Sequence, residues 1–570
     1  MSRAKISILH LSIKKSMKKI LLLNPCQINI PDFNYQTAIA KGYPAYPSMG
    51  LGYLSSVLKS SGKYEIIFHD NYFEGLKIII EQKKNKPEIF LEIYKEILLK
   101  NSDVDIVCIS LMFSSIFNNF INYVKMTKEL LPKCLIITGG SHITCAYESV
   151  MKINEVDYAL MYEADKTILL LLDAIKNNKD KTAISGLVYR NGCEIIKNER
   201  TFREENLDNI PSPDWIGINM PEYYKIGRFG GAYAIEGCEG KPFACITTSR
   251  GCRGHCAFCS VSDIMGGSVR MRSPEPVADE IGRLYNEYGI KFFEILDDDF
   301  TFSKSRALSI MNEIVKRGYD IRWTAKNGLI ACSLDEELIE AMSKSGCRYV
   351  QIGVESGNES IIKWLKKPLT FDKLIEVRKL FRKFPEIYLA GYFIVGFPEE
   401  TYEMMKDTYN LALKLQLDWC AITMAQPLPN TRMFQNFVEL GIISEEKIDW
   451  SDLTFFHNTT GNKYHSMQDI MDWWHEFNIG INFVNNPNLN GGDLDRAIRD
   501  FHHVAYLVAP GQPMALYCLG KAYLKKNNIL ETKKLWAQVC ETIGRDKGWQ
   551  RQFEKFNIYP EIDLKKLSTK

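Results

Sequence analysis

Three cysteines lie on one short stretch of the chain, and their spacing predicts an iron–sulfur site. Cys252, Cys256 and Cys259 are separated by three and then two residues. Three thiolates on one loop can bind three irons of a cubane cluster and leave the fourth iron open to another ligand. Since a substrate or cosubstrate can chelate an open iron, the stretch predicts catalysis as well as metal binding.

Other kinds of site fit the same cysteines less well. A disulfide framework is disfavoured because the fifteen cysteines are an odd number and are otherwise scattered. A bacterial ferredoxin site needs more cysteines and a following proline. A zinc site needs a fourth ligand, and His255 is badly placed for it because it is adjacent to Cys256. A [4Fe–4S] cluster is therefore the favoured interpretation.

The cysteines come directly after a predicted strand, at the start of a series of alternating strands and helices. Short runs rich in β-branched and aromatic residues alternate with helical stretches. This pattern predicts an open or partial (β/α) barrel, in which functional groups collect at the carboxyl ends of the strands. The six predicted strands are residues 244–248, 292–296, 322–325, 349–353, 387–395 and 419–423.

The stretch from Cys252 to Cys259 resembles the signature of the radical S-adenosylmethionine (SAM) superfamily, which has this spacing and an aromatic residue, here Phe258, before the last cysteine. The resemblance implies that Cys252, Cys256 and Cys259 hold a [4Fe–4S] cluster and that SAM chelates its open iron. It further implies an electron donor of the flavodoxin or ferredoxin type, whose electron cleaves SAM to a 5′-deoxyadenosyl radical. The three cysteines are then catalytic residues as well as metal ligands.

Two later strand ends resemble motifs by which this superfamily binds SAM. Asp298 lies at the end of the second strand, where the family places groups that bind the SAM amino group, although a run of carboxylates also fits a solvated turn. Glu355 and Ser356 match the fourth-strand motif, whose Glu and Ser contact SAM. Ser356 or Asn358 also fits the N-cap of a following helix, and the two roles are compatible.

Three further positions extend the resemblance. Gly396 belongs to a segment that resembles the fifth-strand motif, which holds adenine through backbone groups. Gln426 follows the sixth strand as the family pattern expects. Lys326 stands near the place where relatives commonly have an arginine. Lysine lacks the planar guanidinium fork, so either Lys326 or another group must hold the SAM carboxylate.

An earlier series of strands and helices predicts a second, doubly wound α/β domain. Its predicted strands end in small or polar residues, and ligands of open parallel sheets sit at such ends. The strands are residues 20–24, 64–69, 106–111 and 135–139, and the helices are residues 50–61 and 117–131.

This earlier segment, roughly residues 18–180, resembles the cobalamin-binding domain that precedes many radical SAM domains. The matching positions lie in short loops that, in the family, receive the corrin ring and the nucleotide tail. The resemblance therefore implies bound cobalamin and assigns it the residues Ser48, Gly50, Ser110, Gly139 and Gly140.

The segment departs from the family pattern in two ways. It lacks Asp-x-His-x-x-Gly, the motif that supplies a lower axial histidine in many cobalamin enzymes. His69 and His142 are the candidates for such a ligand, but a lone histidine is more often structural, and relatives without the motif often bind cobalamin with no histidine. Where relatives have Gly-Glu-Gly-Glu, this chain has Tyr162, Glu163, Ala164 and Asp165.

The composition excludes several other classes of protein. With 570 residues, 46% of them hydrophobic, a formal charge of +2 and a mean hydropathy of −0.18, the chain is typical of an ordinary multidomain globular protein. The charge indicates no nucleic-acid or anionic-lipid partner. No apolar run reaches transmembrane length, and no secretory signal is recognisable. Scattered single cysteines favour the reducing cytoplasm.

The expected fold class is α/β, with a Rossmann-like domain, a partial (β/α)6 barrel and a small, mostly helical C-terminal domain. Small residues at positions 515, 520 and 522 on one helix of that last domain faintly resemble a single tetratricopeptide unit. The expected organisation is a tail at 1–17, the cobalamin-binding domain at 18–180, a turn-rich linker at 181–240, the radical SAM core at 241–440 and the helical domain at 441–570.

These features favour a cobalamin-dependent radical SAM methyltransferase that acts on an unactivated carbon of a small molecule, lipid, peptide or natural-product precursor. The same cofactors also fit an oxidoreductase or cyclase without methyl transfer, as in the anaerobic tetrapyrrole cyclases. A methylthiotransferase is disfavoured because no second three-cysteine cluster lies upstream. The intact cysteine loop argues against a non-catalytic scaffold.

Overall fold

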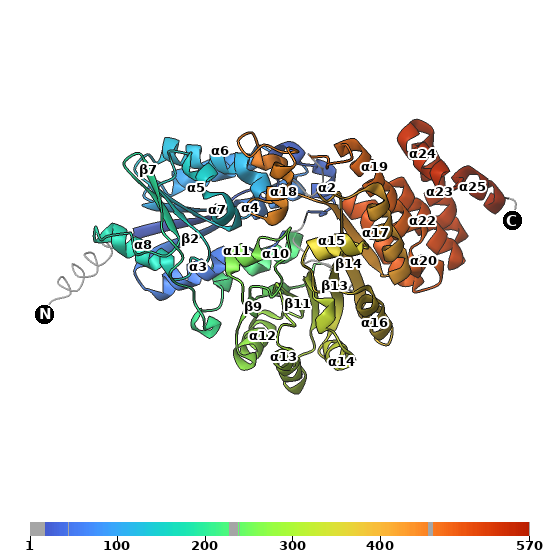
Figure 1. The fold of residues 1–570 in the computed structure, drawn as a ribbon, viewed down its shortest axis with the longest axis horizontal. Coiled ribbons are helices and arrows are strands. Elements are labelled where there is room, and N and C mark those ends of the chain that lie inside the picture. Colours follow the sequence, from blue (N-terminus) through green and yellow to red (C-terminus); the bar gives the residue numbers. More distant parts are fainter. Residues whose placement is uncertain (1–17, 44, 227–237, 239, 454–459, 569–570) are drawn as a thin grey trace.

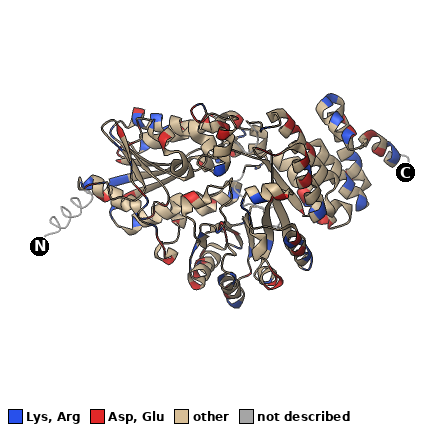
Figure 2. Cartoon of the chain, viewed as in Figure 1, with Lys and Arg blue, Asp and Glu red and all other residues tan. Residues whose placement is uncertain are grey.

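The computed structural model describes residues 18–43, 45–226, 238, 240–453 and 460–568, so the predicted tail at residues 1–17 lies outside the described residues. Figure 1 shows three parts: an N-terminal sheet flanked by helices, a second sheet whose helices fan out on one side, and a group of C-terminal helices. In Figure 2, basic and acidic residues are interspersed over all three parts.

The first sheet has helices on both faces because each strand alternates its apolar side chains. In β1, Leu21 and Leu23 pack with helices α4, α5 and α6, whereas Ile20 and Leu22 pack with α3 and α8. The parallel strands, in spatial order, are β2 (Tyr64–Asp70), β1 (Lys18–Asn24), β3 (Ile106–Ser110), β4 (Leu135–Gly139) and β5 (Tyr158–Leu160). The helices are α3 (Met49–Ser60), α4 (Asn71–Gln82), α5 (Ile89–Lys100), α6 (Phe117–Leu130), α7 (Ser141–Met151) and α8 (Thr167–Lys176).

This sheet continues beyond the predicted boundary at residue 180. Strands β6 (Leu187–Asn191) and β7 (Glu194–Lys197) add to it in antiparallel fashion. The predicted linker at residues 181–240 thus contributes two strands to the first sheet, and this sheet ends after Lys197. The turn between them is the two-residue loop Gly192-Cys193, with Gly192 at φ +64°, and a glycine at the first loop position is typical of a tight hairpin.

Residues 215–226 of the predicted linker also pack against the first domain. Helices α9 (Trp215–Ile218) and α10 (Met220–Ile226) bury Trp215 and Tyr223. The Tyr223 hydroxyl donates a hydrogen bond of 2.5 Å to Asp70, at the carboxyl end of β2. The segment therefore belongs to the packed domain instead of bridging two domains freely.

The second sheet confirms the predicted partial barrel. Its six strands are all parallel and follow the order of the sequence from edge to edge. They are β8 (Phe243–Ile246), β11 (Phe292–Ile295), β12 (Arg322–Leu329), β13 (Cys347–Glu355), β14 (Tyr388–Val395) and β15 (Trp419–Met424). The main connecting helices are α12 (Pro274–Tyr288), α13 (Lys304–Lys316), α14 (Glu336–Lys344), α16 (Phe371–Phe381) and α17 (Tyr402–Leu415).

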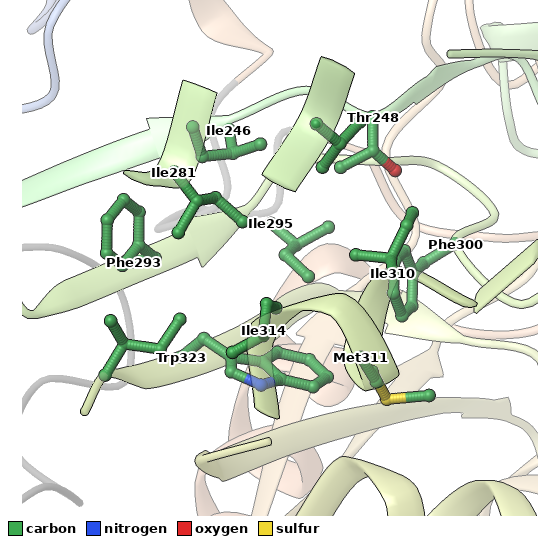
Figure 3. Close-up of a pocket in the computed structure, with 12 residues that line it drawn as sticks. Ile246, Thr248, Ile281, Phe293, Ile295, Phe300, Ile310, Met311, Ile314 and Trp323 are labelled. Atoms are coloured by element: carbon green, nitrogen blue, oxygen red, sulfur yellow. The ribbon is translucent and has the colours of Figure 1, made fainter. Parts of the chain in front are cut away.

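The outer face of this sheet is a packed apolar core. On β11, Phe293 and Ile295 face the helices and line the same apolar space as Trp323 of β12 (Figure 3). Glu294 lies between them in the strand, so the alternation of side chains places it on the opposite face. The side chains in Figure 3 leave a void of about 10 Å³. That volume holds at most about one water molecule, so this void is a packing gap and not a substrate site.

The edge strand β15 is covered by the C-terminal region. Trp474 of α19 (Met467–Asn478) donates its indole N–H to the carbonyl of Ile422 at 2.7 Å. The side chain of Asn482 both accepts from the Cys420 N–H at 2.8 Å and donates to its carbonyl at 2.7 Å, as a neighbouring strand would. These bonds satisfy an otherwise exposed edge. Phe477 of the same helix is buried, so these aromatic side chains serve as core packing.

The C-terminal helices form a core of their own. Helices α22 (Pro513–Lys525) and α23 (Ile529–Arg545) form a hairpin in which Gly520 lies against Trp536. A Cβ at position 520 would lie 2.5 Å from the indole nitrogen, so a small residue is required there. None of the helices in the described part of the chain is long and apolar enough to cross a membrane.

Candidate active site

The three cysteines lie on a loop between a short strand and a short helix at the carboxyl end of the barrel sheet. Strand β9 (Ser249–Arg250) leads into the loop, and helix α11 (Val261–Met265) leads out of it. The N–H of Gly254 lies 3.3 Å from Cys252 Sγ. A Cβ built on Gly254 would lie 3.5 Å from the Sγ atoms of both Cys252 and Cys256, so these two thiols flank the glycine.

The loop is held in place by backbone hydrogen bonds to later elements. Ala257 N–H donates to the Leu365 carbonyl at 3.1 Å, and its carbonyl accepts from Met433 N–H at 2.8 Å. Phe258 is half-buried in the same small apolar cluster. The aromatic residue of the motif therefore seats the loop on the elements that follow the fourth and sixth barrel strands.

Burial raises the pKa of all three thiols, and that of Cys259 reaches about 12. Cluster assembly must therefore release protons, since thiolates are the ligands. Within the described ranges, no three Cys, His, Asp or Glu side chains are gathered closely enough to hold one metal ion. His255, adjacent to Cys256, is exposed.

Three consecutive aspartates after β11 have three different environments. Asp297 accepts hydrogen bonds from Thr248 and Ser249, and Asp299 forms an ion pair with Arg253 at 2.6 Å. Both carboxylates are buried and fix the path of the chain into the cysteine loop.

Asp298, between them, is half-buried and accepts a single hydrogen bond of 3.3 Å, from Gly251 N–H. Burial raises its pKa to about 6. Of the three carboxylates, that of Asp298 can therefore accept the most further hydrogen bonds from a ligand, as its predicted role requires.

A buried ion pair lies beside the cysteine loop. Glu355, the last residue of β13, lies 2.5 Å from the amine of Lys367. The two side chains are 8% and 11% exposed, and Lys367 is close enough to interact electrostatically with Cys256 and Cys259. Gly353 makes room for the pair, because a Cβ there would lie 2.4 Å from the Lys367 amine. Sequence reasoning missed Lys367, which no motif distinguishes from its lysine neighbours.

Ser356 is surrounded by protein groups. Its hydroxyl is fully buried, lies 3.2 Å from Thr408 Oγ1 on α17 and accepts from Asn358 N–H at 3.1 Å. The N-cap of α15 (Glu359–Trp364) is Asn358. Ser356 thus supports the turn after Glu355, and its contact with SAM stays a prediction.

The predicted cobalamin residues lie at the carboxyl ends of the first sheet. Ser110 and Gly139 are register partners in β3 and β4. Gly140 follows with φ +124°, and a Cβ there would lie 2.4 Å from the Leu111 carbonyl, so only glycine lets these two loops approach. Ser48 and Gly50 begin α3, and a Cβ at Gly50 would meet open space.

Neither candidate axial histidine is presented as a free ligand. His142 is buried, its Nδ1 lies 2.8 Å from Ser114 Oγ, and its Nε2 lies 3.2 Å from Ser149 Oγ. Burial lowers its pKa to about 4. His69 is half-buried and lies 3.2 Å from the Asn71 side chain. Both histidines therefore have structural contacts.

The two sites are joined by ion pairs. Glu163 and Asp165, which follow β5 in the first domain, lie 2.8 and 2.7 Å from Arg250. Arg250 lies two residues before Cys252. The carboxyl-end loops of both sheets therefore meet at the cysteine loop.

Comparison with known proteins identifies both parts. The model of the radical SAM superfamily matches residues 246–412, and that of the B12 binding domain matches residues 35–172. An uncharacterised methyltransferase of Pyrococcus horikoshii is 31% identical over 422 residues, which cover 74% of this chain and 83% of the relative. The chain belongs to the radical SAM superfamily. Its B12-binding domain assigns it to the members that carry cobalamin, which confirms the resemblance seen in the sequence.

Further radical SAM relatives agree with this assignment. Cytidylyl-2-hydroxyethylphosphonate methyltransferase of Streptomyces wedmorensis is 28% identical over 467 residues, which cover 75% of this chain and 83% of the relative. The solved structure of the cobalamin-dependent SAM radical enzyme OxsB, with aqua-cobalamin and SAM bound, matches with a TM-score of 0.63 at 16% identity. That match covers 98% of this chain and 84% of the other and shows a shared fold.

The cofactors of this radical SAM enzyme are thus a [4Fe–4S] cluster, SAM and cobalamin. The cluster loop fits its group, because three thiols and a nearby lysine suit an anionic cluster with one open iron. The assignment of individual residues to SAM stays a prediction. Lys326 is half-buried, and its carbonyl accepts from the Tyr392 hydroxyl at 2.9 Å.

Around Gly396, the backbone groups predicted to hold adenine in this radical SAM fold are already partly used. The N–H groups of Gly396 and Phe397 donate to the Glu400 carboxylate at 2.6 and 3.1 Å. Glu400 is fully buried, and burial raises its pKa from 4.5 to about 8. This carboxyl therefore shapes the turn, and the contact of the segment with adenine stays a prediction.

The buried Glu400 predicts a pH-dependent stability. The unfolded carboxyl ionises near 4.5 and the folded one near 8, so the folded state holds an extra proton between these values. The free energy of unfolding should fall as pH rises through this window, by on the order of a few kcal/mol. Glu400→Gln keeps the acceptor oxygen and should remove that loss.

Urea unfolding of the apoprotein at pH 6 and pH 8 measures this effect. Glu399→Gln serves as a matched control, because Glu399 is the exposed neighbour and pairs with Lys463 at 2.7 Å. A pH slope that is the same in the wild type and in Glu400→Gln would show that Glu400 is ionised in the folded state at pH 6.

Proposed function

We propose that this enzyme is a cobalamin-dependent methyltransferase that acts on an unactivated carbon of a small-molecule substrate. The observation that carries the proposal is the contact between the two sites: the cysteine loop is bound by ion pairs to a carboxyl-end loop of the B12-binding domain. Methyl transfer from cobalamin to a carbon radical requires such closeness. The two methyltransferase relatives support the same reaction class.

In this proposal the protein residues bind and orient the cofactors, which supply the radical and the methyl group. Cys252, Cys256 and Cys259 hold the cluster. Asp298 binds the SAM amino group, and Lys367 binds the SAM carboxylate. Two observations support Lys367 over Lys326: its amine lies beside the cysteine thiols, and it is already held in place by a buried carboxylate.

The substrate is expected to lie inside the partial barrel. Side chains that alternate with the outer apolar core point inward, among them Glu294, Tyr392 and Thr423. Tyr392 and Thr423 are only half-buried, and this supports a partly open chamber next to the cluster loop. We therefore propose a compact polar or aromatic substrate, such as a natural-product precursor, in preference to a long lipid chain.

We further propose a flavodoxin- or ferredoxin-type electron donor and a cytoplasmic location. All fifteen cysteines are unpaired thiols, as is typical of proteins in a reducing compartment. The cluster itself needs a low-potential reductant.

A labelling experiment separates methyl transfer from the alternative, a cyclase or oxidoreductase. The protein is reconstituted anaerobically with iron, sulfide and hydroxocobalamin, then reduced in the presence of methyl-deuterated SAM. A methyltransferase should load the deuterated methyl group onto the extracted cobalamin, together with release of S-adenosylhomocysteine. Release of 5′-deoxyadenosine with no label on cobalamin would favour the cyclase alternative. A cobalamin-free protein serves as the control for non-enzymatic methylation.

A further inference from the structure

The turn after β5 carries two carboxylates that are buried against arginines of the other domain. We call residues 162–165 the acidic turn. Its Glu163 lies 2.8 Å from Arg250 and 2.7 Å from Arg270, and its Asp165 lies 2.7 Å from Arg250. The side chains of these four residues are between 3% and 12% exposed. Although burial lowers the pKa of Arg250, Asp165 and Glu163 raise it by more, so this guanidinium stays charged.

Both arginines flank the cysteine loop. Arg250 and Arg270 are register partners in the antiparallel pair formed by β9 and β10 (Arg270–Met271). The loop with its three cysteines connects these two short strands by way of α11. Arg250 also lies over the ring of Tyr53 on α3, at 5.2 Å from its centre. The base of the cysteine loop is thus bound to two elements of the B12-binding domain.

On its other side, the acidic turn contacts the elements that carry the predicted cobalamin residues. Tyr162 N–H donates to Thr144 Oγ1 at 2.8 Å, on α7. Helix α7 begins directly after Gly140 and packs against α11, which follows the cysteines. Arg200 adds a further contact, with its guanidinium 4.5 Å from the centre of the Tyr162 ring. The acidic turn therefore lies between the two predicted cofactor loops. It contacts the arginines at the base of the cysteine loop and helix α7, which follows Gly140.

We propose that Glu163 and Asp165 are positioning residues that fix the distance between the cluster and the corrin ring. The inference rests on the proposed function, since it requires cobalamin beside Gly140. Buried charge pairs are costly to break from one side and hold a defined geometry. Loss of Glu163 takes the carboxylate partner from buried Arg270, and loss of Asp165 leaves Arg250 with Glu163 as its carboxylate partner. Either loss weakens the contact at the base of the cysteine loop, so the loop shifts relative to the first domain.

Pulsed electron paramagnetic resonance (EPR) measures the distance directly. The protein, loaded with the cluster and hydroxocobalamin, is reduced until cob(II)alamin and the reduced cluster coexist, and the spin relaxation of cob(II)alamin is recorded. The wild type should show relaxation enhanced by the cluster. Glu163→Gln and Asp165→Asn should lose part of that enhancement, and Asp165→Glu, which keeps the charge, should restore most of it. Glu313→Gln, at a half-buried ion pair on α13, is the matched control.

Unchanged enhancement in Glu163→Gln and Asp165→Asn, with cluster and cobalamin both bound, would overturn the positioning role. A wild type that binds no cobalamin would overturn the proposed function instead. If a variant does not load its cofactors, hydrogen–deuterium exchange of the apoprotein tests whether the carboxylates hold the cysteine loop in place. Residues 251–266 should exchange faster in that variant than in Glu313→Gln, and equal protection would refute the proposal.

Discussion

Replacement of Cys256 by alanine is expected to abolish SAM cleavage while leaving the fold intact. Its thiol is half-buried on a loop whose path is fixed by other groups, namely the Asp299–Arg253 ion pair and the backbone bonds of Ala257. A cluster with two protein thiolates loses its site, so 5′-deoxyadenosine release should fall by more than the roughly 10- to 100-fold that follows loss of an outer-shell partner. The thermal midpoint of the apoprotein should change little.

Iron content, the absorbance of the reconstituted cluster and 5′-deoxyadenosine release together check this result. Cys193→Ala is the matched control, since that thiol is exposed on the hairpin between β6 and β7. The same tests apply to Cys252 and Cys259. Substantial SAM cleavage by a Cys256→Ala protein with a full cluster would mean that another residue is the third ligand.

Replacement of Lys367 by methionine should have two separable effects. It leaves Glu355 as an unpaired buried carboxylate, which costs about 3–5 kcal/mol of stability. It also removes the cation proposed to hold the SAM carboxylate, and SAM affinity should fall by about 2 kcal/mol or more, roughly thirtyfold. The second effect is the functional one.

The double variant Lys367→Met with Glu355→Gln distinguishes the two effects. With no unpaired charge left, most of the lost stability should return, while SAM affinity should stay low. SAM titrations followed by the EPR spectrum of the reduced cluster give the dissociation constant, and urea unfolding gives the stability. Lys363→Met, at an exposed lysine of α15, is the control. A double variant that binds SAM as the wild type does would assign the carboxylate to another group, with Lys326 the next candidate.

Much of the fold was predictable because its strands are buried on both faces or alternate cleanly. Every predicted strand of both sheets is present, and the cysteine loop follows the first barrel strand as expected. The hairpin of β6 and β7 was missed because its strands are short and β7 is largely exposed, so the hydrophobic pattern is weak there. Its sequence signal is Gly192, in the loop between the two strands.

Site residues were predictable where chemistry depends on local spacing and not where it depends on tertiary contacts. The three cysteines lie within one loop, so their spacing alone was sufficient. Lys367 and Glu400 acquire their environment from residues that are packed around them only in the folded chain. The contacts of the acidic turn were also not predictable from the local sequence. Its difference from the family pattern did not indicate that Glu163 and Asp165 pair with Arg250 of the other domain.

The central claim is that the loop of Cys252, Cys256 and Cys259 holds a cluster that cleaves SAM. The most direct measurement is to reconstitute the protein anaerobically, reduce it with dithionite and add SAM, with EPR spectra before and after and quantification of the products. The account predicts a [4Fe–4S]⁺ signal that shifts when SAM binds, followed by release of 5′-deoxyadenosine and methionine in equal amounts. A cluster that forms and is reduced, but leaves both its signal and the SAM unchanged, would contradict it.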